Sequence, residues 1–83
     1  MFFSKQAVKD ASRIFNAGLK PKVDVLLALL AEDPYTSPPS FKPLRGDLAG
    51  AYSRRITLQH RLVYEVDNGA RVVKVFRMWS HYE

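Results

Sequence analysis

Apolar residues recur at helical spacing near the start of the chain. They lie at i, i+3, i+6 and i+7, a spacing that predicts one apolar helix face. The members of this first stripe are Val8, Ala11, Ile14 and Phe15. Ser4 precedes the stripe and belongs to a residue type favoured as an N-cap, and Gly18 is typical of a helix C-terminus. The pattern therefore predicts a first helix between these two residues.

A second apolar stripe follows at i, i+3, i+4 and i+7. It begins near Pro21, a residue suited to the first turn of a helix, and ends at Asp33, because the residue before a proline avoids the helical conformation. Its members are Val23, Leu26, Leu27 and Leu30, widened by Val25 and Leu29. These positions predict a second helix that packs on the same core as the first.

Beyond a proline-rich loop at 34–43, the pattern changes to short runs rich in β-branched and aromatic residues. The predicted strands cover about 51–57, 60–67 and 70–79. Asn68-Gly69 favours a type I′ hairpin turn, and Met1 to Phe3 is expected to add a short edge strand. We therefore predict one α+β domain over residues 1–83, with two helices on one face of a small, mostly antiparallel sheet.

The composition narrows the classes of function. A chain of 83 residues has no cysteine, which excludes disulfides, thiolate nucleophiles and cysteine-based zinc sites. The first ten residues lack the apolar region of a signal peptide, and the longest uncharged apolar run, 25–31, is too short to span a bilayer. A cytoplasmic protein is expected.

The net charge of +5 is concentrated in the second half of the chain. Residues 1–41 carry five basic and four acidic groups, whereas residues 42–83 carry eight basic and four acidic groups. Such a surplus favours a polyanionic partner, since phosphate contacts release counterions. The alternative is a solvated basic surface without nucleic-acid function.

Arginines are unusually frequent in the predicted strands. They are Arg54, Arg55, Arg61, Arg71 and Arg77. The arginine fork can hold a phosphate through two hydrogen bonds, so the group is expected to bind RNA from the open face of the sheet. For a single arginine, a solvated position or an ion pair with Asp47, Glu65 or Asp67 is the more ordinary interpretation.

The two histidines are expected to have different roles. His60 is expected to be structural, whereas His81, next to Tyr82 at the end of the last strand, is a candidate proton donor beside a stacking ring. Two histidines without a carboxylate at ligand spacing argue against a metal site. Ser80 is not a credible nucleophile, because neighbouring strand residues point to opposite faces.

Several motifs together resemble the YoeB/Txe family of toxins in the RelE superfamily. They are LRGDLAGAYSRRI at 44–56, HRLVY at 60–64, the terminal His81-Tyr82 and the opening FSKQAVKD at 3–10. The resemblance implies a toxin of a type II toxin–antitoxin pair that cleaves mRNA in the ribosomal A site without a cofactor. It also implies a cognate antitoxin of the YefM/Phd-like kind as partner, and a homodimer as a further expectation.

The resemblance assigns roles to individual residues. Arg55 and Arg61 match the arginines that hold the scissile phosphate, His81 matches the terminal general acid, and Tyr82 matches the residue that orients the substrate. Arg45 falls where the family commonly has a lysine near the phosphate. Arg54 and Arg77 are expected to add RNA contacts from the same sheet.

Lys42 departs from the family pattern, because the general-base glutamate is expected at its position. Three hypotheses follow. Either Lys42 serves as base or phosphate clamp in an active endoribonuclease, or the chain is a weakened module that binds RNA, ribosome and antitoxin. The third hypothesis is an interaction domain in which Arg55 and Arg61 have no role in RNA binding.

Overall fold

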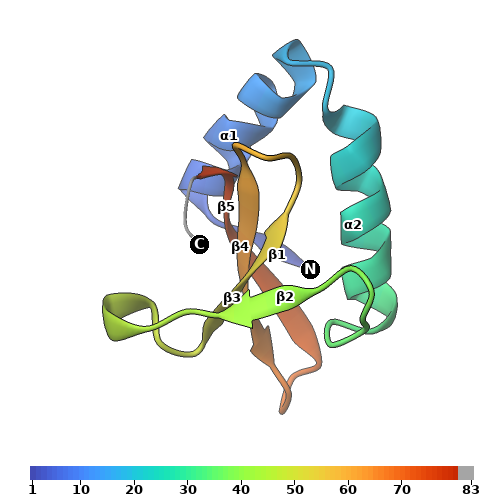
Figure 1. Ribbon diagram of the computed structural model, residues 1–83. Coiled ribbons are helices and arrows are strands. Elements are labelled where there is room, and N and C mark those ends of the chain that lie inside the picture. The colour runs from blue at the N-terminus through green and yellow to red at the C-terminus, as the bar shows by residue number, and fades with distance from the viewer. Residues whose placement is uncertain (81–83) are drawn as a thin grey trace.

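The computed structural model describes residues 1–80, so the expectations for His81 and Tyr82 lie outside the described residues. The elements, in chain order, are β1 (Phe2–Phe3), α1 (Lys5–Asn16), α2 (Lys20–Glu32), β2 (Phe41–Pro43), the 3-10 turn η1 (Gly46–Leu48), β3 (Ala51–Arg55), β4 (Arg61–Asp67) and β5 (Val72–Ser80). They form a sheet of order β1-β5-β4-β3-β2, in which only β1 pairs in parallel among the strands of residues 1–80. This arrangement confirms the predicted α+β class (Figure 1). Over the same residues, neither helix has the length and apolar character that crossing a membrane requires.

The first helix is capped as predicted. The Ser4 hydroxyl accepts a hydrogen bond from the Ala7 N–H at 3.0 Å and donates to the Phe76 carbonyl of β5 at 2.7 Å. The cap therefore stabilises the first turn and also ties α1 to the last strand.

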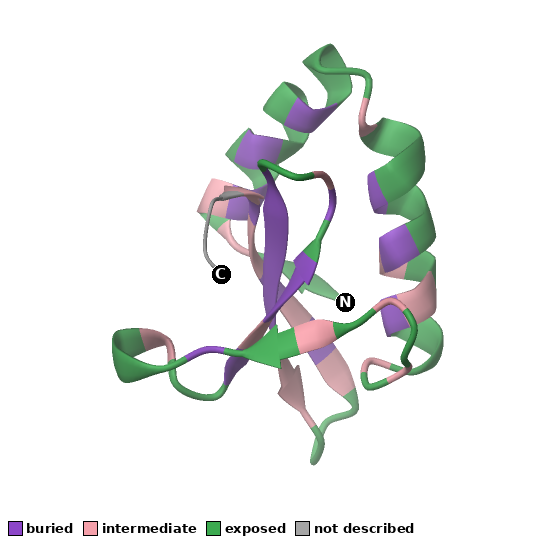
Figure 2. Ribbon diagram, in the orientation of Figure 1, coloured by how far each residue is buried: buried purple, intermediate pink, exposed green. Residues whose placement is uncertain are grey.

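The predicted core face of α1 is wrong in part. Ala7, Asp10 and Ile14 are its buried residues, whereas Val8 and Phe15 are 60% and 66% exposed. Figure 2 shows the buried residues of both helices on the sides that face the strands. Asp10 lies at the centre of the buried face, so the neighbouring stripe, which is apolar throughout, was the face that the pattern predicted to be buried.

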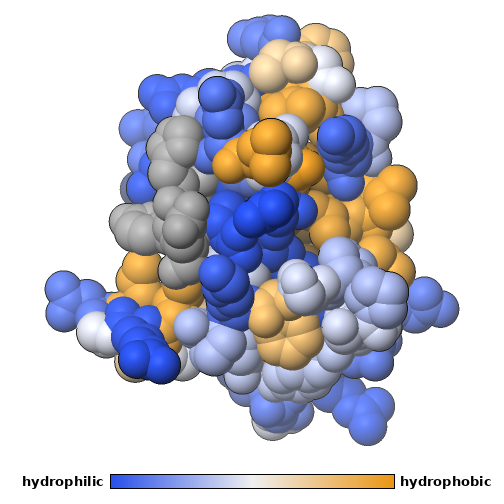
Figure 3. Space-filling view, in the orientation of Figure 1, coloured by the Kyte–Doolittle hydropathy of each residue, from blue (hydrophilic) through white to orange (hydrophobic). Residues whose placement is uncertain are grey.

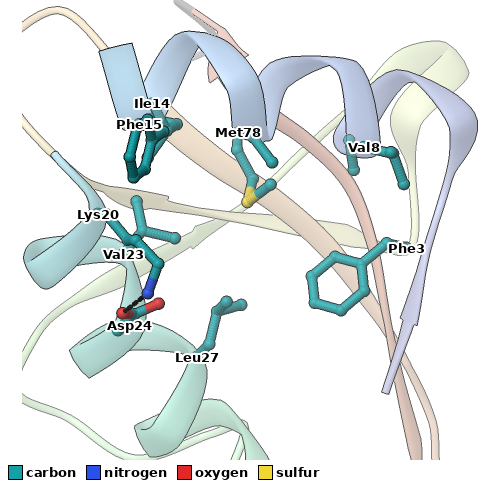
Figure 4. A pocket seen from close by; sticks show the side chains of 11 residues that line it. Phe3, Val8, Ile14, Phe15, Lys20, Val23, Asp24, Leu27 and Met78 are labelled. Carbon is teal, nitrogen blue, oxygen red and sulfur yellow. Dashed lines mark hydrogen bonds and ion pairs between the residues drawn. The ribbon is translucent and has the colours of Figure 1, made fainter. Parts of the chain in front are cut away.

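The exposed apolar residues of α1 line an open pocket between the helices. Figure 1 shows α1 and α2 diverging from their connection, and Figure 4 shows side chains from both helices and from β1 around the space between them. The pocket has a volume of about 360 Å³, and Phe3, Phe15 and Leu27 contribute to its lining. Its floor includes Met78 of β5.

The two faces of the sheet are different in character. The helix-side face carries Leu62, Tyr64 and Val75, which pack with both helices in the main core. The opposite face, here called the open face, carries a small apolar cluster of Leu44, Ala51 and Val63. Because side chains alternate along β4, Arg61 lies on the same face as Val63.

The three predicted strands are confirmed within two residues at each end, but two details were wrong. The loop predicted over 34–43 is wrong for residues 41–43, which form β2, an edge strand in which Pro43 is tolerated. The β4–β5 hairpin is present, but its turn spans 68–71 and the positive φ falls on Arg71, at 53°. The Asp67 carboxylate accepts from the Ala70 N–H at 3.2 Å, which stabilises this longer turn.

Candidate functional site

Four residues from three neighbouring strands meet on the open face. Arg55 of β3 is directly opposite Arg61 of β4, and Lys42 of β2 is directly opposite Ser53 of β3. Directly opposed residues have Cβ atoms about 5 Å apart, and neighbouring strands lie about 4.8 Å apart. Lys42, Arg55 and Arg61, here called the basic cluster, therefore surround the Ser53 position.

Two members of the basic cluster, Arg55 and Arg61, are like charges directly opposite one another. Like charges directly opposite one another destabilise a sheet. Within residues 1–80, the ion pairs join Lys20 to Asp24 and Arg77 to Asp10, so neither Lys42 nor Arg55 has a carboxylate partner there. Figure 3 shows strongly hydrophilic side chains gathered in the centre of the view, where β3 and β4 run in Figure 1. The arrangement suits a phosphate.

Arg61 is held rigidly within this cluster. Its side chain is buried, its Nε donates to the Ser53 hydroxyl at 2.7 Å, and its Nη2 donates to the Ser53 carbonyl at 3.4 Å. Arg55 and Lys42 are exposed. One cation of the cluster is thus fixed by the fold, and two can adjust to a ligand.

The assignment of Arg54 to RNA binding is wrong. Arg54 is 0% exposed, and its guanidinium donates to the Tyr64 hydroxyl at 2.9 Å and to the carbonyls of Pro39 and Pro34 at 2.5 and 3.0 Å. The guanidinium carbon also lies 4.7 Å from the centre of the Phe41 ring, a cation–π distance. Arg54 therefore anchors the 34–39 loop on the helix side of the sheet and cannot reach a phosphate on the open face.

Arg77 anchors the last strand to α1. Its Nε lies 3.3 Å from the Asp10 carboxylate, which also accepts from the backbone N–H groups of Met78 and Trp79 at 3.0 and 3.2 Å. Burial raises the pKa of Asp10, but these hydrogen bonds and one from Gln6 outweigh it and hold the pKa below its ordinary value. The Arg77 side chain is 34% exposed, so contact with RNA stays a prediction beside this structural role.

Three further residues considered from the sequence, Arg45, Arg71 and His60, lie in different parts of the fold. Arg45 is exposed at the N-terminal end of η1, two residues after the end of β2, and a role near the phosphate stays a prediction. Arg71 lies in the hairpin turn at the other end of β4, about 20 Å from Arg61 along the strand, so it is not part of the basic cluster. His60 is buried and stacks on Trp79 with ring centres 3.7 Å apart, as its structural interpretation requires.

Sequence reasoning missed two residues of this region. Ser53 and Asp10 are both 0% exposed and both bind an arginine side chain. The only signal for Asp10 is its position three residues after Ala7 and four before Ile14, where an apolar residue is expected. Ser53 lies within the 44–56 motif that carries the family resemblance, but its residue type alone does not indicate a bond to Arg61.

Comparison with known proteins identifies the family. Residues 3–82 match the model described as "YoeB-like toxin of bacterial type II toxin-antitoxin system". A toxin YoeB of Streptomyces coelicolor is 40% identical over 52 residues, which are 63% of this chain and 62% of that protein. The matched part thus spans less than two thirds of that relative.

Two solved structures share the fold over nearly the whole chain. A YoeB/ParE toxin from Agrobacterium tumefaciens has a TM-score of 0.87 at 29% identity, covering 98% of this chain and 96% of that one. A YoeB–YefM complex from Staphylococcus aureus has a TM-score of 0.82 at 32% identity, covering 98% and 94%. With the family model matched over residues 3–82, this chain belongs to the YoeB-like toxins of bacterial type II toxin–antitoxin systems.

Proposed function

We propose that this toxin is an mRNA endoribonuclease that acts in the ribosomal A site and thereby inhibits translation. The observation that carries the proposal is the basic cluster, in which Arg55 directly opposes Arg61 and Lys42 lies one strand further across. Two opposed guanidinium groups are stabilised when a phosphate lies between them. RNA supplies such a phosphate at every nucleotide.

The proposed chemistry is transfer of the phosphate to the neighbouring ribose. The 2′-oxygen loses its proton to a base and bonds to phosphorus, the bond from phosphorus to the 5′-oxygen breaks, and an acid protonates that oxygen. The products are a 2′,3′-cyclic phosphate and a 5′-hydroxyl. Arg55 and Arg61 would stabilise the additional negative charge on the phosphorane. His81 as the acid and Tyr82 as the orienting residue are carried over from the family resemblance.

Lys42 determines whether cleavage is efficient. Lys42 is directly opposite Ser53, the residue that binds Arg61, and its ammonium group would be a suitable clamp for a phosphate held by Arg61. An ammonium group has no lone pair to accept the 2′-proton, so Lys42 would serve as a base only in its neutral form. Loss of a general base typically lowers a rate by about 10²–10⁴-fold.

This position also supports the second candidate function. A basic cluster with a lysine in place of the expected glutamate would grip RNA or the ribosome without cutting it. The two functions predict different results from one substitution, Lys42→Glu. An active enzyme cuts mRNA before the substitution, whereas a binding module gains cuts only after it.

The test is expression of the chain in bacteria, followed by mapping of mRNA 5′ ends. Cuts at codon-defined positions, lost in Arg55→Ala and Arg61→Ala, would support the proposal. Arg13→Ala is the matched control, because Arg13 is exposed on α1 on the other side of the sheet. If growth inhibition survives both cluster substitutions, neither RNA-based function is correct.

An antitoxin partner is part of the same proposal. The Staphylococcus aureus relative was solved in complex with YefM. For this chain, we expect a cognate antitoxin with an acidic, partly disordered segment that folds onto the toxin, because such a segment would neutralise the basic cluster. Co-purification with the product of a neighbouring gene, weakened by raised salt, is the expected observation.

A further inference from the structure

Ser53 accepts hydrogen bonds from the side chain of Arg61. It lies in the middle of β3, is 0% exposed, and receives two hydrogen bonds from the same guanidinium group. Its hydroxyl oxygen accepts from Nε at 2.7 Å and its carbonyl oxygen accepts from Nη2. Both bonds involve the same edge of the fork, so they set the plane of the guanidinium as well as its position.

We propose that Ser53 is a positioning residue of the active site, which holds Arg61 in the orientation that binds the scissile phosphate. The inference rests on the proposed function, since it assigns Arg61 to that phosphate. Ser53 itself would not contact the reacting atoms. Its effect passes through the arginine, because the two hydrogen bonds to Ser53 help to set the plane of the guanidinium group.

The sheet register explains why the hydroxyl belongs at this position. Ser53 is directly opposite Val63 on one side and Lys42 on the other, while Arg61 reaches it diagonally. A serine hydroxyl is short enough to fit under the arginine and still accepts a strong, charge-assisted hydrogen bond. An alanine here would leave the guanidinium in the same buried space without the hydroxyl that accepts from its Nε.

The expected effect is a loss of rate at constant binding. Misplacement of a catalytic group by about 1 Å can lower a rate by about 10²-fold. We therefore expect Ser53→Ala to lower kcat on ribosome-bound mRNA by about 10- to 100-fold, with KM for ribosomes changed far less. Ser53→Thr keeps the hydroxyl and is the expected rescue. Should Ser53→Ala fail to fold, Ser53→Cys preserves the volume but offers only a weak acceptor.

A double-mutant cycle separates positioning from general stability. If Ser53 acts through Arg61, the variant Ser53→Ala with Arg61→Ala is as slow as Arg61→Ala alone. Losses that multiply instead would overturn the proposal. The rates are measured per folded molecule on the full chain, with Arg13→Ala as the variant expected to keep wild-type activity.

A second readout does not depend on cleavage. In the NMR spectrum of the full chain, the Arg61 Nε–H should exchange slowly with solvent, exchange quickly in Ser53→Ala, and be slow again in Ser53→Thr. If the natural chain cuts no mRNA, the proposed function fails, and binding of a 2′-O-methyl RNA oligonucleotide becomes the measured quantity in the same cycle. Non-additive losses of affinity would then support the inference. Additive losses, unchanged exchange of Nε–H in Ser53→Ala, or no RNA binding by the natural chain would each refute it.

Discussion

Replacement of Arg54 by alanine should remove a large part of the stability of the domain. Arg54 is fully buried and donates three hydrogen bonds, to Tyr64, Pro39 and Pro34. Hydrogen bonds from a charged donor contribute about 1.5–3 kcal/mol each. The Pro34 carbonyl keeps a second donor, the Tyr64 hydroxyl at 3.2 Å, so part of the loss is recovered. We therefore expect a loss of about 3–5 kcal/mol.

This loss is large compared with the stability of the whole domain. At about 0.05–0.15 kcal/mol per residue, 83 residues give a free energy of unfolding of about 4–12 kcal/mol. A loss of 3 kcal/mol would lower the Tm by at least about 12 °C, since each kcal/mol corresponds to about 4–8 °C in a domain of this size. If the free energy of unfolding of the natural chain lies near the lower end of this range, the Arg54→Ala variant would not fold.

The neighbouring residue provides the control. Arg55 is exposed and is the next residue of the same strand, so Arg55→Ala should change stability by no more than about 0.5 kcal/mol. Urea unfolding followed by the fluorescence of Trp79, the only tryptophan of the chain, measures both variants. Equal midpoints for Arg54→Ala and Arg55→Ala would refute the reasoning, because the two substitutions remove the same charge and differ only in burial and contacts.

Three further predictions concern other buried groups. Folding lowers the pKa of Asp10, so the ionised carboxylate stabilises the folded chain above pH 3.8. This stabilisation is lost as the pH falls from 3.8 through the pKa of the folded state. In acid titrations of stability, the natural chain should therefore lose its advantage over Asp10→Asn below pH 3.8. Burial raises the pKa of Tyr64 above its ordinary value of 10.0, so stability should fall above pH 10 as the unfolded tyrosine ionises, and Tyr64→Phe should show a weaker fall. Ile14→Ala should lower the free energy of unfolding by about 2–5 kcal/mol and Phe15→Ala by less than about 1 kcal/mol; equal losses would restore the exposed stripe as the core face.

Local patterns predicted most of the elements and the buried face of α2, but they did not predict the strand β2 or the buried face of α1. The Ser4 cap and the three long strands follow from residue type and spacing, and all are present. The buried face of α1 could not be read from spacing, because Asp10 occupies a core position that only its donors on β5 make acceptable. Whether a polar residue within an apolar stripe is buried depends on hydrogen-bond partners that the local sequence does not reveal.

The candidate site was predictable in its residue types and not in its geometry. Alternation along β3 indicates that Arg54 and Arg55 point to opposite faces, but the carbonyls that receive Arg54 come from a loop with no regular pattern. The place of Lys42 beside Arg61 depends on β2, whose three residues are too few to produce a strand signal. Long-range pairing therefore assembled the site from segments that look unrelated in the sequence.

The direct opposition of Arg55 and Arg61 has a consequence for the lifetime of the chain in a cell. Any anionic ligand that binds the folded protein and not the unfolded one raises stability through mass action, by about 2.7 kcal/mol at a concentration one hundred times its Kd. Arg55 has no carboxylate partner among residues 1–80, so an anion bound beside it would stabilise the folded chain. Proteases act on unfolded chains, so the half-life of the toxin should depend on whether RNA, ribosome or an acidic partner occupies the cluster.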